Sequence, residues 1–159
     1  MTGINSKQNR YIIWADHKKA IIGKFDERNR FSHLIIRSNI ETRHRFPGET
    51  TNKIRLSTST RNRQTFEQNK FHQQLADYVK KIIGSLENVL SLLIIGPADT
   101  KYVLHKETEN KKQFEGVEIN VQPADKLTLP MLQEKGREYY RIPAPPRGLR
   151  RRRSLLLGN

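Results

Sequence analysis

The sequence predicts one α/β domain built on a mixed sheet of five strands, with its elements in the order β-β-β-α-β-α-β-α. Three short runs of β-branched and aromatic residues follow one another within residues 11–36, with polar turns between them. A nearly continuous apolar run occupies residues 89–95, and stretches with helical spacing of apolar residues lie before and after it. The chain of 159 residues has room for one core and not for two full domains.

The first part of the chain is expected to form an antiparallel meander of three strands. The runs at residues 11–14 and 20–25 are separated by a polar turn, and a third run at 31–36 follows the turn-like residues 26–29. Strands that are joined by such short turns pair with their neighbours in antiparallel fashion.

A helix and a central strand are expected next. Thr65 and Gln68 have the spacing of a capping box, which predicts that the helix begins at Thr65. Gly84 is expected to end it. The run at 89–95 is apolar on both faces, as is typical of a strand covered by helices on each side. The apolar residues at helical spacing are Phe71, Leu75, Tyr78, Val79, Ile82, Ile83 and Leu86.

The second helix is expected to follow Gly96 and Pro97, where the central strand ends. Asp99 is the expected N-cap, and the helix runs to about residue 110 with Tyr102 and Val103 turned inward.

The end of the domain is expected to add a fifth strand and a third helix. Residues 117–121 alternate between apolar and polar, which predicts a strand. The last helix follows Thr128, because Pro130 is tolerated in a first helical turn. A meander of three strands followed by two strands with helical crossovers is the topology of the ribonuclease H-like fold.

Most of the positive charge lies in two segments that are attached to this core. The formal net charge is +14, of which residues 37–63 carry +5 and residues 141–159 carry +6. The first segment is a long hydrophilic insertion after the third strand, and loops of this length are usually functional or disordered. The second contains the proline-rich residues 143–146, which favour an extended conformation. We therefore divide the chain into a flexible N-terminus (1–9), a domain (10–141) with the basic loop 37–63 inserted, and a Pro/Arg-rich tail (142–159).

Segments of this kind suit a polyanion, because each neutralised phosphate releases counterions. Nucleic acid is therefore the expected partner, with arginine supplying bidentate phosphate contacts and Phe46, the only aromatic residue of the loop, supplying one stacking contact. The alternatives are a solvated surface loop and, for the tail, a general electrostatic anchor or a localisation signal. The residues expected to contact RNA are Arg43, Arg45, Phe46, Lys53, Arg55, Arg61, Arg63, Arg147, Arg150, Arg151, Arg152 and Arg153.

Composition disfavours several other functions. The chain has no cysteine, which removes disulfides, thiolate catalysis and cysteine-based zinc sites. Its longest apolar run is far below the roughly 20 residues of a membrane helix, its start is polar, and a cytoplasmic location is the simplest expectation. No glycine pattern for nucleotide phosphates is present, and no cofactor is expected.

Acidic residues and histidines are possible metal ligands, since nucleases of the ribonuclease H-like fold hold two metal ions about 4 Å apart with an acidic cluster. Each acidic candidate except Glu67 has a structural explanation: a turn for Asp16, a helix cap for Asp99 and a loop for Asp125. The histidines lack a ligand spacing and are expected to be surface or partly buried side chains. They are His17, His33, His44, His72 and His105.

Three blocks of sequence carry a family resemblance: residues 14–20 (WADHKKA), 94–101 (IIGPADTK) and 124–128 (ADKLT). They resemble small bacterial proteins that are related to the middle domain of the archaeal and eukaryotic class I release factors and of Pelota. The resemblance covers about residues 11–141 and implies the ribonuclease H-like fold of the translation machinery and a place on or near the ribosome. The release factors carry a catalytic Gly-Gly-Gln tripeptide after the early strands. This sequence has none, and the basic loop around Pro47 and Gly48 stands in its place.

The resemblance also bears on Lys101 and on the tail. Lys101 matches a position that the family tends to keep basic, and a lysine beside a helix N-terminus would make a phosphate site, whereas the alternative is an exposed helix lysine. The three leucines at 155–157 point to a protein groove, so ribosomal proteins are further possible partners of the tail.

These observations predict a non-enzymatic, ribosome-associated RNA-binding factor that docks on ribosomal RNA through its basic loop and tail, in hibernation, rescue or occupancy of the ribosome. Two other functions remain open. A structural ribosomal protein also has basic extensions on a small core. A metal-dependent nuclease of the ribonuclease H-like fold is the enzymatic alternative.

Overall fold

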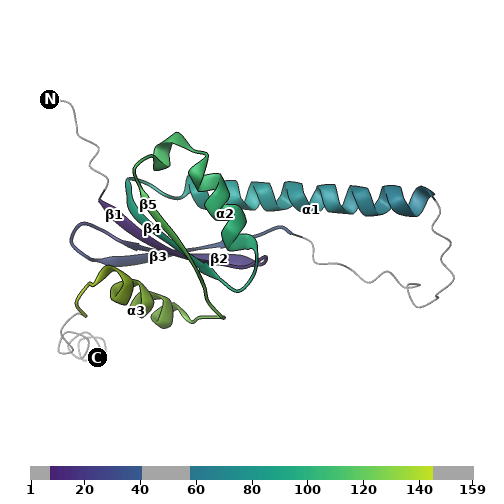
Figure 1. Ribbon diagram of the computed structural model, residues 1–159. Helices are drawn as coiled ribbons and strands as arrows, with labels where there is room; N and C mark the ends of the chain where they lie inside the picture. The colour runs from purple at the N-terminus through teal and green to yellow at the C-terminus, as the bar shows by residue number, and fades with distance from the viewer. Residues whose placement is uncertain (1–7, 41–57, 145–159) are drawn as a thin grey trace, which may run out of the picture.

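The structure is a computed structural model that describes residues 8–40 and 58–144, with side chains described from residue 64 in the second range. Its elements follow the predicted order, with one short additional 3-10 helix, η1 (Figure 1). They are β1 (Asn9–Ala15), β2 (Lys19–Phe25), β3 (Phe31–Arg37), α1 (Thr58–Gly84), β4 (Val89–Gly96), α2 (Thr100–Glu109), η1 (Lys112–Phe114), β5 (Glu118–Pro123) and α3 (Leu129–Tyr140).

The strands form one mixed sheet in the order β3-β2-β1-β4-β5. β1, β2 and β3 are an antiparallel meander, and β4 and β5 continue the sheet parallel to β1. This confirms the predicted α/β domain with a mixed five-stranded sheet. Because β1, β4 and β5 are parallel, they end on the same side of the sheet, which we call the carboxyl end. Its strand termini are Ala15, Lys19, Arg37, Gly96 and Pro123.

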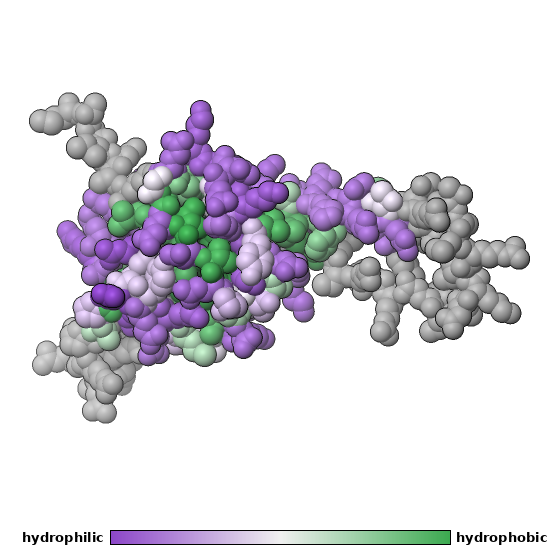
Figure 2. All heavy atoms as spheres, viewed as in Figure 1, coloured by the Kyte–Doolittle hydropathy of each residue, from purple (hydrophilic) through white to green (hydrophobic). Residues whose placement is uncertain are grey.

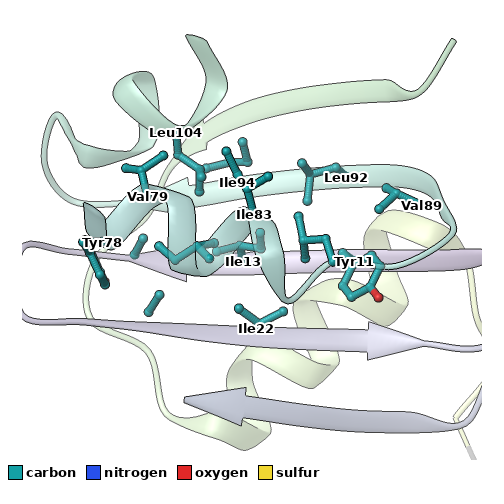
Figure 3. Close-up of a cluster of buried hydrophobic side chains, with 14 of the residues drawn as sticks. Tyr11, Ile13, Ile22, Tyr78, Val79, Ile83, Val89, Leu92, Ile94 and Leu104 are labelled. Carbon is teal, nitrogen blue, oxygen red and sulfur yellow. The ribbon is translucent and has the colours of Figure 1, made fainter. Parts of the chain in front are cut away.

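Helices cover both faces of the sheet, as the apolar pattern of β4 predicts. α1 and α2 lie on one face, where Ile13, Val79 and Leu104 belong to one buried cluster (Figure 3). α3 lies on the other face, where Leu132 packs with Trp14 and its neighbours. Alternate residues of β1 therefore enter opposite cores, in keeping with the two-residue repeat of a strand.

Helix α1 is longer than the sequence pattern indicates, because it begins at Thr58. The prediction that it starts at Thr65 is wrong. Residues 58–64 contain no apolar residue, so they carry no helical periodicity from which a start could be inferred. The side chains of residues 64–70 are all exposed, and continuous burial begins only at Leu75.

The N-terminal part of α1, residues 58–70, projects past the sheet at the carboxyl end (Figure 1), and we call it the α1 arm. At 1.5 Å per residue it is about 20 Å long. Its described side chains are mostly hydrophilic (Figure 2), and Phe66 is the exception with 68% of its surface exposed. The α1 arm therefore has no apolar face that packs against the rest of the described domain.

The packed domain begins and ends within one residue of the expected bounds, 10 and 141. β1 begins at Asn9, next to the expected domain start at residue 10. Ile142 is buried in the cluster under α3, so the packed domain includes at least this residue beyond 141. Residues 1–7 and 145–159 lie outside the described part of the chain, as does the segment 41–57.

Candidate nucleic-acid interface

The three sequence blocks come together at the carboxyl end of the sheet. The first block follows β1, the second follows β4 and the third follows β5. Hydrogen bonds join them: Trp14 Nε1 donates to the carbonyl oxygen of Asp125 at 3.0 Å, and the backbone N–H of Ala124 donates to the carbonyl oxygen of Gly96 at 3.1 Å. Residues that are far apart in the sequence thus form one connected surface.

The turn of the first block is held by Asp16. Its Oδ1 atom accepts hydrogen bonds from the backbone N–H groups of Lys18 and Lys19, each at 2.8 Å. Its carbonyl oxygen accepts a hydrogen bond from the hydroxyl of Tyr78 on α1 at 3.1 Å. Asp16 is therefore the turn residue that the sequence predicts, and it also ties the turn to α1.

His17 connects the turn with three other parts of the carboxyl end. Its Nδ1 atom lies 3.2 Å from Oγ1 of Thr100, the first residue of α2. Its ring packs edge-on against Phe71 of α1, with 5.8 Å between the ring centroids. Its carbonyl oxygen accepts a hydrogen bond from the hydroxyl of Ser38, just after β3. Sequence reasoning placed His17 only among surface or partly buried side chains, because no local spacing relates it to Thr100 or Phe71.

Gly96 allows β4 to approach β1 at the end of the strand. A Cβ atom at this position would collide with the carbonyl oxygen of Ala15. The glycine therefore sets the close spacing at which the first and second blocks meet.

Lys101 is buried, with 5% of its surface exposed. Its ammonium donates a hydrogen bond to the carbonyl oxygen of Ala98 at 2.7 Å and lies 4.6 Å from the centre of the Tyr102 ring. The alternative of an exposed helix lysine is therefore wrong. Among the described residues no carboxylate forms an ion pair with Lys101, so the Ala98 carbonyl and the Tyr102 ring are the contacts of its ammonium.

Two expectations about the start of α2 need correction. Tyr102 is 57% exposed, so the prediction that it turns inward is wrong, whereas Val103 does pack against the core. Asp99 occupies the N-cap position, but its side chain makes no capping hydrogen bond. The predicted inward face of α2 differs by one residue from the observed one. The buried residues of α2 are Thr100, Lys101, Leu104 and Thr108.

The exposed side chains at the carboxyl end are suited to an anionic partner. Lys18, Arg37 and Lys126 are exposed there and come from the β1–β2 turn, the end of β3 and the third block. Tyr102 and Phe66 add exposed rings from α2 and the α1 arm. Surfaces that bind single-stranded nucleic acid combine basic side chains, which contact phosphates, with aromatic side chains, which stack on bases.

The carboxylates considered as metal ligands do not assemble. Within residues 8–40 and 58–144, no group of three or more acidic or histidine side chains is close enough to hold a metal ion. Glu67 is exposed on the α1 arm, and Asp125 is exposed in the loop before α3.

The other histidines lie apart from this surface or at its border. His105 pairs with Glu109 one turn along α2, at 3.3 Å between Nε2 and Oε1. His72 is exposed on α1 beside Phe71, and His33 is exposed on β3. His44 lies outside the described residues.

Most of the residues expected to contact RNA cannot be placed on this surface. Arg61 and Arg63 belong to the α1 arm, where only the backbone is described. The others lie in the segments 41–57 and 145–159, outside the described residues. They are Arg43, Arg45, Phe46, Lys53, Arg55, Arg147, Arg150, Arg151, Arg152 and Arg153. The described residues nevertheless place both attachment points of the first segment, at Ile40 after β3 and at Thr58 at the tip of the arm.

An open hollow of about 630 Å³ lies at the opposite, amino end of the sheet, lined by residues that include Arg10, Tyr139 and Arg141. No residue of the three blocks lines it. The carboxyl end is therefore the better candidate for an interface. Among the described residues, no helix is long and apolar enough to cross a membrane.

Comparisons with known proteins give structural neighbours only. No protein-family model matches the chain, and no curated protein matches it. The fold is similar to that of the Pelota protein of Thermoplasma acidophilum, with a TM-score of 0.48 and 15% identity over 84% of this chain and 33% of that one. It is also similar to the archaeal translation termination factor aRF1, with a TM-score of 0.40 and 14% identity over 85% of this chain and 37% of that one. The chain thus spans about a third of the length of either neighbour.

Proposed function

We propose that this chain is a non-enzymatic RNA-binding factor of the translation machinery, with a ribonuclease H-like domain that docks on ribosomal RNA in the cytoplasm. The carboxyl end of the sheet and the α1 arm form the docking surface, together with the basic loop 37–63 and the tail. The docking occupies a site on the ribosome, in hibernation or rescue.

The observation that carries the proposal is the convergence at the carboxyl end. The three blocks meet there through Trp14, His17 and Thr100. The α1 arm leaves from the same end, and the segment 41–57 joins Ile40 to the tip of the arm. The three blocks and both attachment points of the basic loop therefore lie on one side of the molecule.

The distribution of charge also favours a polyanion as the partner. Residues 8–40 and 64–144 together carry a net charge of +4, whereas the segments 41–63 and 145–159 carry +4 and +5 in far fewer residues. A nearly balanced domain that carries concentrated cations is suited to a polyanion, because the attraction grows with the number of phosphates contacted. Ribosomal RNA is the polyanion that the resemblance implies.

We propose a non-enzymatic factor because the chain lacks the catalytic tripeptide of the related factors. Peptide release in the related factors depends on the Gly-Gly-Gln tripeptide, and this sequence contains no such tripeptide. Asp16, one of the four acidic candidates for a metal site, uses its Oδ1 atom to hold its own turn.

Two charge-reversal variants with the same net charge test the docking surface. The first reverses Lys18, Arg37 and Lys126 at the carboxyl end to Glu. The second reverses Arg28, Lys106 and Lys112, which are equally exposed but lie toward the amino end. Both variants change the net charge by the same amount, so a difference between them reports on position. We expect the first to bind ribosomal RNA at least about tenfold more weakly than the second, and its salt slope to fall by about 0.7–0.9 for each phosphate that it no longer neutralises.

Co-sedimentation with ribosomes tests the partner. The wild-type chain is expected to pellet with ribosomal particles at low salt and to leave them steeply as salt rises. Free sedimentation at low salt, or equal weakening by the two reversal variants, would contradict the proposal.

A further inference from the structure

We propose that β3 pairs edge to edge with β3 of a second copy of this chain, in antiparallel fashion, to form a two-fold symmetric dimer with one continuous sheet. This inference concerns the β3 edge, which shares Arg37 with the proposed RNA interface, and it does not depend on that interface.

Within the described residues, β3 is an unpaired edge of the sheet, and Arg37 at its end is its one formally charged residue. β3 is the outermost strand, it pairs with β2 over seven residues without a register shift, and it contains no lysine, proline or acidic residue. Proteins usually protect such an edge with charges, proline or a bulge, because its free backbone groups pair with any available strand. The opposite edge, β5, has such protection, since it carries Glu118 and ends at Pro123.

Apolar side chains are exposed on both faces of β3. Leu34 is 48% exposed and Ile35 is 47% exposed. Leu34 lies opposite Ile22, which belongs to the core under α1, and Ile35 lies opposite Ile21, which belongs to the core under α3. The helices therefore leave the sheet uncovered on both faces at Leu34 and Ile35.

The hydrogen bonds at the ends of the β2–β3 pair show which backbone groups are directed outward. Ser38 N–H donates to the carbonyl of Lys18 at 2.8 Å, and Asp26 N–H donates to the carbonyl of Arg30 at 3.1 Å. Hydrogen-bonded pairs alternate along an antiparallel ladder, so the even-numbered residues of β3 bond to β2. The residues with outward-directed N–H and C=O groups are Phe31, His33, Ile35 and Arg37.

One register of self-pairing satisfies all of these groups. It places Leu34 opposite Leu34 of the second copy, so that His33 pairs with Ile35 and Phe31 pairs with Arg37. A shift by two residues in either direction leaves an outward-directed residue at the end of each strand unpaired. The symmetric register also sets no two like charges opposite each other, and it brings each Arg37 guanidinium to the Phe31 ring of the second copy, as in a cation–π contact.

The size of the contact sets the strength of the dimer. Seven paired residues give a strip about 24 Å long, one sheet thick. This is at the small end of specific interfaces, so we expect a dimer that forms reversibly at micromolar or higher concentration. Two copies that each carry +14 repel each other, so salt strengthens this dimer. The RNA complex depends on salt in the opposite way, which separates the two proposals experimentally.

Cysteine cross-linking tests the register, because the natural chain has no cysteine. In the proposed pairing the two Cα atoms at position 34 are about 4.5 Å apart in a non-hydrogen-bonded pair, within the range of a disulfide. Leu34→Cys should therefore give a covalent dimer on mild oxidation. Ile35→Cys and Leu90→Cys should not, since the two copies of residue 35 are about 8 Å apart and Leu90, an exposed strand leucine, is not on this edge.

Sedimentation equilibrium of the nuclease-treated protein in high salt tests the dimer without cross-linking. Leu34→Lys should weaken it at least about tenfold, because it sets two ammonium groups opposite each other, whereas Leu90→Lys should leave it unchanged. Circular dichroism checks that both variants fold. A monomer at all concentrations up to several hundred micromolar, or cross-linking of all three cysteine variants alike, would overturn the proposal. Coverage of β3 by another segment of the chain or by a different protein would appear as the first of these outcomes.

Discussion

The Nδ1 atom of His17 lies 3.2 Å from Oγ1 of Thr100, although 83 residues separate them in the chain. His17 closes the first hairpin and Thr100 opens α2, so this contact joins the first and the second of the three sequence blocks. It forms because β1 and β4 are parallel neighbours whose ends coincide.

A double-mutant cycle measures this contact. We expect His17→Ala and Thr100→Val to couple by about 0.5–1.5 kcal/mol in the free energy of unfolding, as for one side-chain hydrogen bond. Urea titration of the wild type, both single variants and the double variant gives the value. His72→Ala is the control, because His72 also contacts the Phe71 ring but no hydrogen bond joins it to Thr100. It should be additive with Thr100→Val within about 0.5 kcal/mol. Equal coupling in both cycles would mean that the His17 contact contributes nothing specific.

Replacement of Gly96 by alanine should destabilise the domain by about 1–3 kcal/mol. The new Cβ atom would collide with the backbone carbonyl of Ala15, which cannot rotate away as a side chain does. Gly84→Ala is the matched control. No atom lies within 4 Å of its new Cβ, and the residue ends α1, so the change should be neutral or stabilising by up to about 1 kcal/mol. Urea unfolding of the two variants checks the difference, and a neutral Gly96→Ala would show that the strands can separate freely.

Lys101→Met should lower the free energy of unfolding by about 1.5–3 kcal/mol. The methionine fills the buried space but leaves the Ala98 carbonyl without the hydrogen bond from the ammonium. Lys106→Met on the exposed side of the same helix should change stability by no more than about 0.5 kcal/mol. Thermal or urea unfolding compares the two. If they are alike, the hydrogen bond from Lys101 does not stabilise the loop before α2.

Stability should decline at alkaline pH. Burial raises the pKa of Tyr78 and of Tyr140 above the ordinary value of about 10, and the charge of Asp16 adds to the effect at Tyr78. A pKa that is higher in the folded than in the unfolded state contributes its full stability below the unfolded pKa and loses it as pH rises toward the folded value. We therefore expect no loss from these groups below about pH 9, and a decline above about pH 10 of at most about 1.4 kcal/mol per pH unit for each tyrosine.

Urea unfolding between pH 8 and pH 11 measures this decline. Tyr140→Phe removes one of the tyrosines with a raised pKa, so the stability of the variant should fall less steeply above pH 10. The variant starts from a lower stability, because the hydrogen bond from the Tyr140 hydroxyl to the Tyr11 carbonyl is absent. An unchanged slope in the variant would remove Tyr140 from the explanation.

Sequence reasoning predicted the strands well and the polar features poorly. The strands and the packed half of α1 have strong apolar patterns, so their existence and order follow from the sequence. The α1 arm was missed, because a helix without a buried face has no periodicity. The prediction that Tyr102 turns inward was wrong, because the exposure of a side chain on α2 depends on how the helix is rotated about its axis. The contact of His17 with Thr100 has no local signal at all.

The order of the elements, the two cores and the concentration of charge in two segments follow from apolar spacing and charge, which are local properties of the chain. Where these features meet depends on the pairing of the strands. The parallel register of β1, β4 and β5 brings three distant blocks and the base of the α1 arm to one end of the sheet. The order of the strands leaves β3 as an edge with exposed Leu34 and Ile35. Both results follow from hydrogen bonding between strands, which pairs residues by their position in the sheet and not by their distance along the chain.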